Sequence, residues 1–116
     1  MLGNIYHLKG QYESAIDQYN IAISLSPREG QMYKYRGIAY ADIGEYKNSI
    51  EDYSYALTLT PDDTELYKYR GLAYYYENEL EKAKRDWQKA DNEVNTKEKI
   101  GISVQDLLEN LERRLR

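Results

Sequence analysis

The segment YKYRGIAYADIGEYKNSIEDYSYALTLTP, residues 33–61, is followed by a second version of itself, YKYRGLAYYYENELEKAKRDWQKADNEVN, at residues 67–95. The second copy begins thirty-four residues after the first, and the two share Tyr, Arg, Gly, Asp and Ala at matching positions. Upstream, residues 3–27 match residues 37–61 at the same offset. A period of this length indicates a solenoid, in which each unit packs on its neighbour.

Each period contains two stretches whose apolar residues recur at helical spacing. In the middle copy they span residues 30–43 and 46–59, and Gly44 lies between them. The same repeat position holds Gly10 and Asn78, and Gly or Asn suits the left-handed residue that ends a helix. We therefore predict an antiparallel helix pair in each of three units, with turns at Gly10, Gly44 and Asn78.

A glycine also recurs inside each predicted first helix, at Gly3, Gly37 and Gly71. Glycine costs about 1 kcal/mol relative to alanine in a helix interior, so its repetition needs a steric reason. We expect the second helix of each pair to approach closely at these positions.

These features resemble the tetratricopeptide repeat, whose signature has an aromatic residue, Leu-Gly, Tyr, a small residue, a second aromatic residue and Pro at fixed positions. The signature positions hold Tyr33, Gly37, Tyr40, Ser49, Tyr53 and Pro61 in the middle copy, and Tyr67, Gly71, Tyr74, Ala83 and Trp87 in the last. The resemblance covers residues 1–95 and implies an all-α fold, a right-handed α-solenoid of antiparallel helix pairs. Its units are a partial repeat at 1–29 and repeats at 30–63 and 64–95.

The C-terminal segment continues differently. We expect a polar linker at 96–102 and then a helix at 103–116, which Ser103 can cap. An apolar stripe follows this helix at Val104, Leu107, Leu108, Leu111 and Leu115. Such a helix resembles the one that covers the last repeat in the family, with a partner-binding helix as the alternative. At the other end, the first repeat lacks the cover expected of a terminal unit.

Composition excludes several functions for this chain of 116 residues. It has no Cys and one His, so we expect no disulfide, no thiolate or histidine metal cluster and no cofactor. There is no glycine-rich phosphate loop and no isolated carboxylate pair, so we expect no catalysis. The net charge of −4 argues against nucleic acid as a partner. No long apolar run or signal segment is present, so we expect a soluble protein without a membrane span, with the cytoplasm favoured.

Most of the fourteen Tyr residues fall at positions that form the core in the family. These are Tyr6, Tyr12, Tyr19, Tyr33, Tyr40, Tyr46, Tyr53, Tyr67 and Tyr74. Their expected role is aromatic packing between helices, with the hydroxyl reaching an edge.

Other residues take positions that line the concave, peptide-binding groove in the family. The resemblance implies a partner-binding groove made of Asn4, His7, Gln31, Lys34, Tyr35, Ile38, Asp42, Glu65, Lys68, Tyr69, Leu72, Tyr75 and Tyr76. Tyrosine beside lysine suits recognition, because Tyr gives a large contact area at low entropic cost. Alternatively, Tyr35 and Tyr69 fill space between repeats. We interpret His7 as a solvated groove residue rather than a pH sensor.

Arginine replaces the signature Leu at Arg36 and Arg70, and an Asp follows each sixteen residues later, at Asp52 and Asp86. The first repeat lacks both, with Leu2 and Gln18 in their places. Because the two residue types appear and disappear together, we predict Arg–Asp pairs that link helices.

One subgroup of the family grips the C-terminal carboxylate of heat-shock chaperones through a clamp of Lys, Asn and Arg. Asn4 matches that clamp, but Tyr35, Glu65 and Tyr69 occupy three other clamp positions. Glu65 would repel the anion that the clamp attracts, so we expect no carboxylate clamp.

We therefore predict a protein-interaction module that binds a protein or peptide segment in its groove, with Lys34 and Lys68 favouring acidic residues. The main alternative is a self-associating unit, a homo-oligomer formed through the uncovered first repeat. A third interpretation is single-stranded RNA bound by stacking on Tyr, which the alternation of Lys with Asp42 and Glu65 disfavours.

Overall fold

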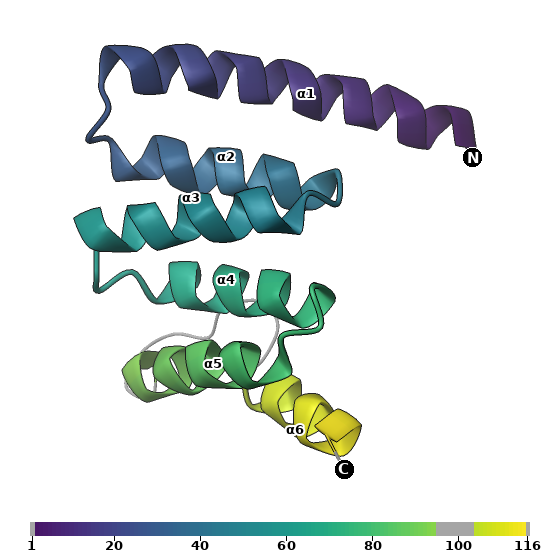
Figure 1. Cartoon of the computed structure of the whole chain (residues 1–116), viewed down its shortest axis with the longest axis vertical. Coiled ribbons are helices and arrows are strands. Elements are labelled where there is room, and N and C mark those ends of the chain that lie inside the picture. Colours follow the sequence, from purple (N-terminus) through teal and green to yellow (C-terminus); the bar gives the residue numbers. More distant parts are fainter. Residues whose placement is uncertain (1, 95–103, 116) are drawn as a thin grey trace. The chain divides into compact units, whose positions relative to one another are not determined.

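The computed structural model describes residues 2–94 and 104–115, and all regular structure within them is helical. The helices are α1 (Leu2–Leu25), α2 (Gly30–Asp42), α3 (Tyr46–Leu59), α4 (Thr64–Tyr76), α5 (Leu80–Val94) and α6 (Val104–Leu115) (Figure 1). The chain divides into two compact units, residues 1–61 and residues 62–116. The first unit contains α1 to α3, and the second contains α4 to α6. The predicted all-α fold is confirmed.

Both complete helix pairs turn where the sequence predicts. Gly44 and Asn78 have positive φ angles of 84° and 63°, the left-handed conformation that ends a helix. The amide of Glu45 donates to the carbonyl oxygen of Tyr40 at 2.8 Å, and the amide of Glu79 donates to that of Tyr74 at the same distance. The same backbone hydrogen bond therefore closes the α2–α3 and α4–α5 turns.

The glycines inside α2 and α4 mark the closest approach of each helix pair. A Cβ atom built on Gly37 would lie 2.6 Å from the ring of Tyr53, and one on Gly71 would collide with the indole of Trp87. Each ring is 1% exposed. Across the first contact Ser49 Oγ donates to the carbonyl oxygen of Gly37 at 2.8 Å. The steric reason inferred for these two glycines is confirmed.

The predicted turn at Gly10 is wrong. Helix α1 runs for 24 residues from Leu2 to Leu25 without interruption, and Gly10 has no positive φ. In Figure 1 the N-terminal turns of α1 extend past the ends of α2 and α3. Residues 2–25 therefore form one long helix, and the helix pair expected in the partial repeat at 1–29 is absent.

The second unit has its core where α5 meets α6. The buried side chains of Ala83, Trp87, Ala90, Leu108 and Leu111 form one cluster. Two residues of the predicted apolar stripe, Leu108 and Leu111, thus lie in the core of their own unit. The predicted linker at 96–102 lies outside the described residues.

The predicted core tyrosines differ in burial. Tyr53 is 1% exposed, whereas Tyr12, Tyr19, Tyr33, Tyr40, Tyr46, Tyr67 and Tyr74 are partly buried. The side chain of Tyr6 lies outside the described part of the chain. Among the tyrosines of this set whose side chains are described, only Tyr53, which faces Gly37 in a complete helix pair, is fully buried.

Candidate protein-interaction surface

In the first unit, the predicted groove residues of α2 form one stripe along the helix. Gln31, Lys34, Tyr35, Ile38 and Asp42 each lie three or four residues from another member of the set, which places them along one side of the helix. Gln31 and Asp42 are exposed, Ile38 is partly buried, and Tyr35 is 44% exposed. The α2 stripe therefore offers a mixed polar and aromatic surface.

Tyr35 is the aromatic residue that this stripe presents. Its ring centroid lies 6.1 Å from that of Tyr19 on α1, with the two planes tilted by 32°. A neighbouring ring limits the rotamers of Tyr35 without covering it, so a partner would meet a partly ordered aromatic side chain.

The two lysines of the predicted groove are buried. Lys34 is 7% exposed and Lys68 is 6% exposed. Burial lowers the pKa of Lys68, and the nearby Glu65 carboxylate only partly opposes this effect. The surface therefore offers less lysine charge to an acidic partner than the sequence suggests.

In the second unit, the groove residues of α4 fall into two groups. Leu72 and Tyr75 pack against the cluster that contains Leu108 and Leu111, so they belong to the core of this unit. Glu65 and Tyr69 are partly buried, and Tyr76 is 61% exposed. Tyr76 is therefore the accessible aromatic residue of the α4 stripe.

Helix α6 contacts Tyr75, and Tyr75 in turn contacts Tyr76. The guanidinium carbon of Arg114 lies 4.7 Å from the ring centroid of Tyr75, and Arg114 Nη2 donates to Asn78 Oδ1 at 3.1 Å. The rings of Tyr75 and Tyr76 meet edge to face at 5.6 Å. The sequence places both tyrosines in the groove but gives no sign of the contribution of α6 to the packing of Tyr75.

The structure does not bring positions 4 and 7 alongside the α2 stripe. Asn4 and His7 lie in the part of α1 before Gly10, and the first turns of α1 extend past α2 in Figure 1. A turn at Gly10 would be needed to fold this segment back along the helix pair. The groove positions predicted on the first repeat are therefore separated from those on the second.

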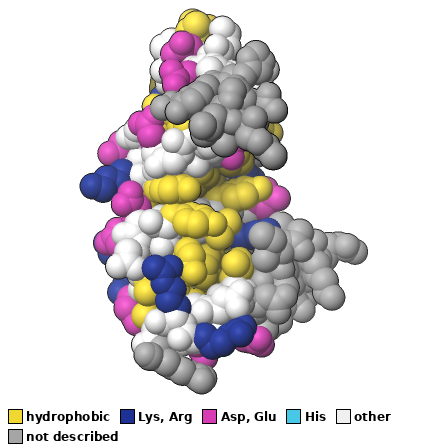
Figure 2. Space-filling view, turned by 90° about the vertical axis from the view of Figure 1, so that its right-hand side faces the viewer, with side chains coloured by type: hydrophobic (Ala, Val, Ile, Leu, Met, Phe, Trp, Pro, Cys, Tyr) yellow, Lys and Arg dark blue, Asp and Glu magenta, His cyan; other side chains and the backbone are white. Residues whose placement is uncertain are grey.

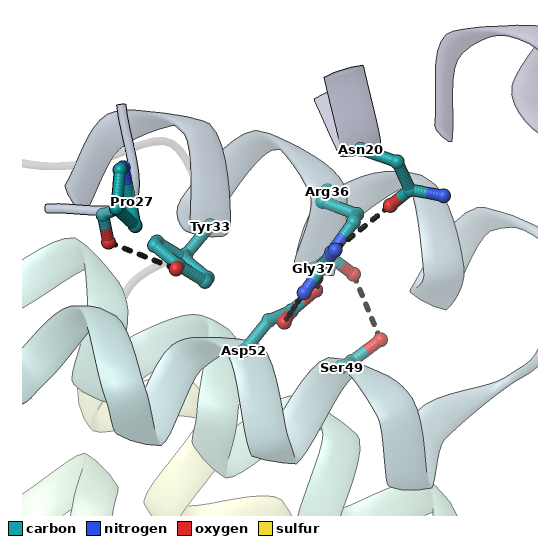
Figure 3. A network of polar contacts seen from close by, with 7 residues as sticks. All are labelled: Asn20, Pro27, Tyr33, Arg36, Gly37, Ser49 and Asp52. Atoms are coloured by element: carbon teal, nitrogen blue, oxygen red, sulfur yellow. Dashed lines mark hydrogen bonds and ion pairs between the residues drawn. The ribbon is translucent and has the colours of Figure 1, made fainter. Parts of the chain in front are cut away.

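A separate polar network crosses the first unit (Figure 3). Arg36 Nε donates to Asp52 Oδ2 at 2.8 Å, and Arg36 Nη2 donates to Asp52 Oδ1 at 2.7 Å. Its remaining nitrogen, Nη1, donates to Asn20 Oδ1 at 2.8 Å. One guanidinium thus connects α1, α2 and α3, and the predicted Arg–Asp pair is confirmed.

The second unit repeats the bidentate pair. Arg70 Nε and Nη2 donate to Asp86 Oδ2 and Oδ1 at 2.8 and 2.7 Å. Tyrosine rings flank each guanidinium at 5.5 to 5.9 Å, namely Tyr33 and Tyr40 around Arg36, and Tyr67 and Tyr74 around Arg70. The hydrogen bonds to Asp raise the pKa of both arginines. These arginines are engaged in helix packing rather than presented to a ligand.

Asn20 is the member of this network that sequence reasoning missed. It precedes Arg36 by sixteen residues, the same separation by which Asp52 follows it. That symmetry around the arginine is a signal that could have identified Asn20.

Charges of both signs are distributed over the surface. Figure 2 shows Lys and Arg side chains, Asp and Glu side chains, and hydrophobic side chains all exposed on one face of the molecule. Within residues 2–94 and 104–115, no helix combines the length and apolar content needed to cross a bilayer. Among the residues whose side chains the structure describes, 10–91 and 107–115, there is no group of three metal-ligating side chains that could hold a metal ion.

The helix pairs, their glycine contacts and the exposed stripes define a helical-repeat protein. The family model described as "TPR repeat" matches residues 3–44 and 37–76, so the chain belongs to the tetratricopeptide-repeat family, with about three repeats. The match includes residues 3–10, although no turn follows them in the structure. No curated protein sequence matches the chain significantly.

Solved structures with the same fold include several tetratricopeptide domains. The first such domain of Spaghetti (RPAP3), bound to the HSP90 peptide SRMEEVD, is 25% identical with a TM-score of 0.83, covering 97% of this chain and 86% of that one. The first tetratricopeptide domain of human RPAP3 is 25% identical in sequence with a TM-score of 0.82, and the match covers 97% of this chain and 86% of that one. The type III secretion translocator chaperone SycD of Yersinia enterocolitica is 20% identical in sequence with a TM-score of 0.85, and the match covers 98% of this chain and 85% of that one. The last of these similarities concerns the fold alone.

Proposed function

We propose that this chain is a non-catalytic protein-interaction module that binds a peptide or helix of a partner protein, with an aromatic stripe on α2 in the first unit and another on α4 in the second as its binding surfaces. The observation that carries the proposal is the exposure of Tyr35 and Tyr76, at 44% and 61%, on stripes whose other aromatic residues are more buried. Large aromatic side chains that remain accessible on a rigid helix face are the usual anchors of protein recognition.

The family supports binding as the general activity, because the related Spaghetti domain holds a peptide. The kind of peptide differs here. Glu65 and Tyr69 stand at positions where the chaperone clamp has basic residues, and the two groove lysines are buried. We propose that the partner segment is bound through aromatic contacts and hydrogen bonds rather than through a terminal carboxylate.

A peptide-display library panned on the folded chain tests this proposal. Peptides that bind should lose affinity at least tenfold for the Tyr35→Ala or Tyr76→Ala variant, because each substitution removes a large contact area. Tyr55→Ala is the matched control, since Tyr55 is 42% exposed on α3, outside both stripes. Circular dichroism confirms that each variant is folded.

The outcomes separate clearly. Loss of binding in the two stripe variants, with retention in Tyr55→Ala, supports the proposed surface. Selected peptides that bind all four proteins equally would place the binding site elsewhere, and a library that yields no binder would contradict peptide recognition by these stripes.

A further inference from the structure

Residues 2–9 have the sequence of a first repeat helix but the structure of a helical extension. By the thirty-four-residue register, Gly3 corresponds to Gly37, and Gly10 corresponds to Gly44. At Gly44 the chain reverses with a φ of 84°, whereas at Gly10 it continues straight. The first repeat therefore possesses a first helix in sequence that is not folded against its second helix.

The face of α1 that such a helix would cover is correspondingly open. In the complete pairs, the residues facing the first helix are sealed: Ser49 and Ala83 are 0% exposed, and Tyr53 and Trp87 are 1% exposed. Their counterparts in α1, Ala15 and Tyr19, remain partly exposed. We call the surface around Ala15 and Tyr19 the open α1 face.

Because α1 is straight, residues 2–9 cannot pack on the open α1 face of the same molecule. Residues 2–9 continue along the axis of the helix that carries Ala15 and Tyr19, so they cannot lie beside it without a reversal at Gly10. A Cβ built on Gly10 meets no atom within 4 Å, so a side chain could be added at this position without a clash. Each molecule thus carries one extended first helix and one open α1 face.

We propose that residues 2–9 of one molecule pack on the open α1 face of a second copy, and that the second copy reciprocates, giving a dimer by exchange of first helices. The segment fits because it carries the glycine register that, in the complete pairs, receives Tyr53 and Trp87. The reciprocal exchange uses both extended helices and both faces, so assembly closes at two copies. This dimerisation goes beyond the proposed partner binding and does not depend on it.

The Arg–Asp pairs of the other repeats provide a way to test the exchange. Leu2 holds the repeat position of Arg36 and Arg70, and Gln18 holds that of Asp52 and Asp86. The single variants Leu2→Arg and Gln18→Asp each introduce one half of the pair. In an exchanged dimer the two halves can meet only when the two variants are mixed.

The experiment is native mass spectrometry of an equimolar mixture of the Leu2→Arg chain and an isotope-labelled Gln18→Asp chain. We expect more heterodimer than random mixing of the two chains would give, with the heterodimer severalfold more abundant than either homodimer. A mixture of labelled and unlabelled parent chains gives the statistical share. Size-exclusion chromatography with light scattering on the parent chain should show a mass that rises from monomer to dimer with concentration, without larger species.

Other outcomes overturn the proposal. A parent chain that is monomeric throughout the concentration range contradicts exchange, and a statistical heterodimer share in the variant mixture contradicts this mode of dimerisation. The Gly10→Ala variant keeps the proposal testable if either charged variant fails to fold. Alanine favours the continuous helix and excludes the left-handed turn, so Gly10→Ala should remain dimeric, and a monomeric Gly10→Ala chain would contradict the exchange.

Discussion

Arg36 and Asp52 join α2 to α3 through two parallel hydrogen bonds of 2.8 and 2.7 Å, and Arg70 and Asp86 repeat this geometry between α4 and α5. The side chain of Asp52 is only 7% exposed and that of Arg36 is 20% exposed, so the pair is largely removed from water. A pair of this kind replaces the leucine of the family signature with a directional link between helices. Its main consequence is that neither member can be removed alone without cost.

We predict that Arg36→Leu destabilises the chain by about 3 kcal/mol, because it leaves the Asp52 carboxylate buried without its partner. The double variant Arg36→Leu with Asp52→Ala should recover at least about 1 kcal/mol of this loss. The free energy of unfolding, measured by urea denaturation of the parent, Arg36→Leu, Asp52→Ala and the double variant, gives the coupling. Additive effects of the two substitutions would show that the pair contributes no interaction energy.

We predict that Gly44→Ala and Gly10→Ala have opposite effects on stability. Alanine at Gly44 is strained by the φ of 84° and should lower the free energy of unfolding by about 1 kcal/mol. At Gly10 the helix is continuous, so alanine should raise it by up to about 1 kcal/mol. The melting temperature of each variant is compared with that of the parent chain at the same protein concentration. A Gly10→Ala chain that is less stable than the parent would indicate a turn at Gly10.

We predict that Gly37→Ala lowers stability by about 2 kcal/mol, because the new methyl group would lie 2.6 Å from the buried ring of Tyr53. Gly30→Ala is the matched control in the same helix, since the nearest atom to its Cβ would be 3.6 Å away. Thermal unfolding followed by circular dichroism should separate the two variants. Equal melting temperatures would show that α3 can shift away at little cost.

We predict that Lys68→Met leaves stability at neutral pH unchanged or raises it, because it removes an ammonium group that burial disfavours. The lowered pKa of Lys68 also has a pH signature. The pKa of Lys68 is 10.5 in the unfolded chain and lower in the folded chain. As the pH rises toward 10.5, the folded chain therefore loses this proton before the unfolded chain does, and the free energy of unfolding increases with pH. The difference in unfolding free energy between parent and Lys68→Met, followed from pH 8 to pH 10.5, measures it. A Lys68→Met chain that is strongly destabilised at pH 8 would contradict this prediction.

We predict that the parent chain does not bind the peptide SRMEEVD at micromolar concentration, and that Glu65→Lys with Tyr69→Arg gives measurable binding. The two substitutions place basic residues where the parent has a carboxylate and a phenol ring, so they should favour the peptide's anionic C-terminus. Fluorescence anisotropy of the labelled peptide in low salt provides the measurement. The amidated peptide is the control, and equal binding of both forms would show that the carboxylate is not recognised.

The features that depend on local conformation and on the repeat register could be predicted from the amino-acid sequence. Gly44 and Asn78 take the left-handed conformation because few other residues can, and Gly37 is required by the ring that packs on it. The Arg36–Asp52 pair was recognisable because both residues vary together between repeats. Each of these features involves contacts within one helix pair.

The conformation at Gly10 and the exposure of the groove residues depend on tertiary packing and could not be predicted from the sequence. Glycine permits a turn at Gly10 without enforcing it, since a helix pair is stabilised by packing of its two faces and not by the turn residue alone. The burial of Lys34 and Lys68, and the covering of Tyr75 by Arg114, depend on side chains from elsewhere in the fold. Repeat register specifies which helical face a residue occupies, whereas its exposure is set by whatever packs against that face.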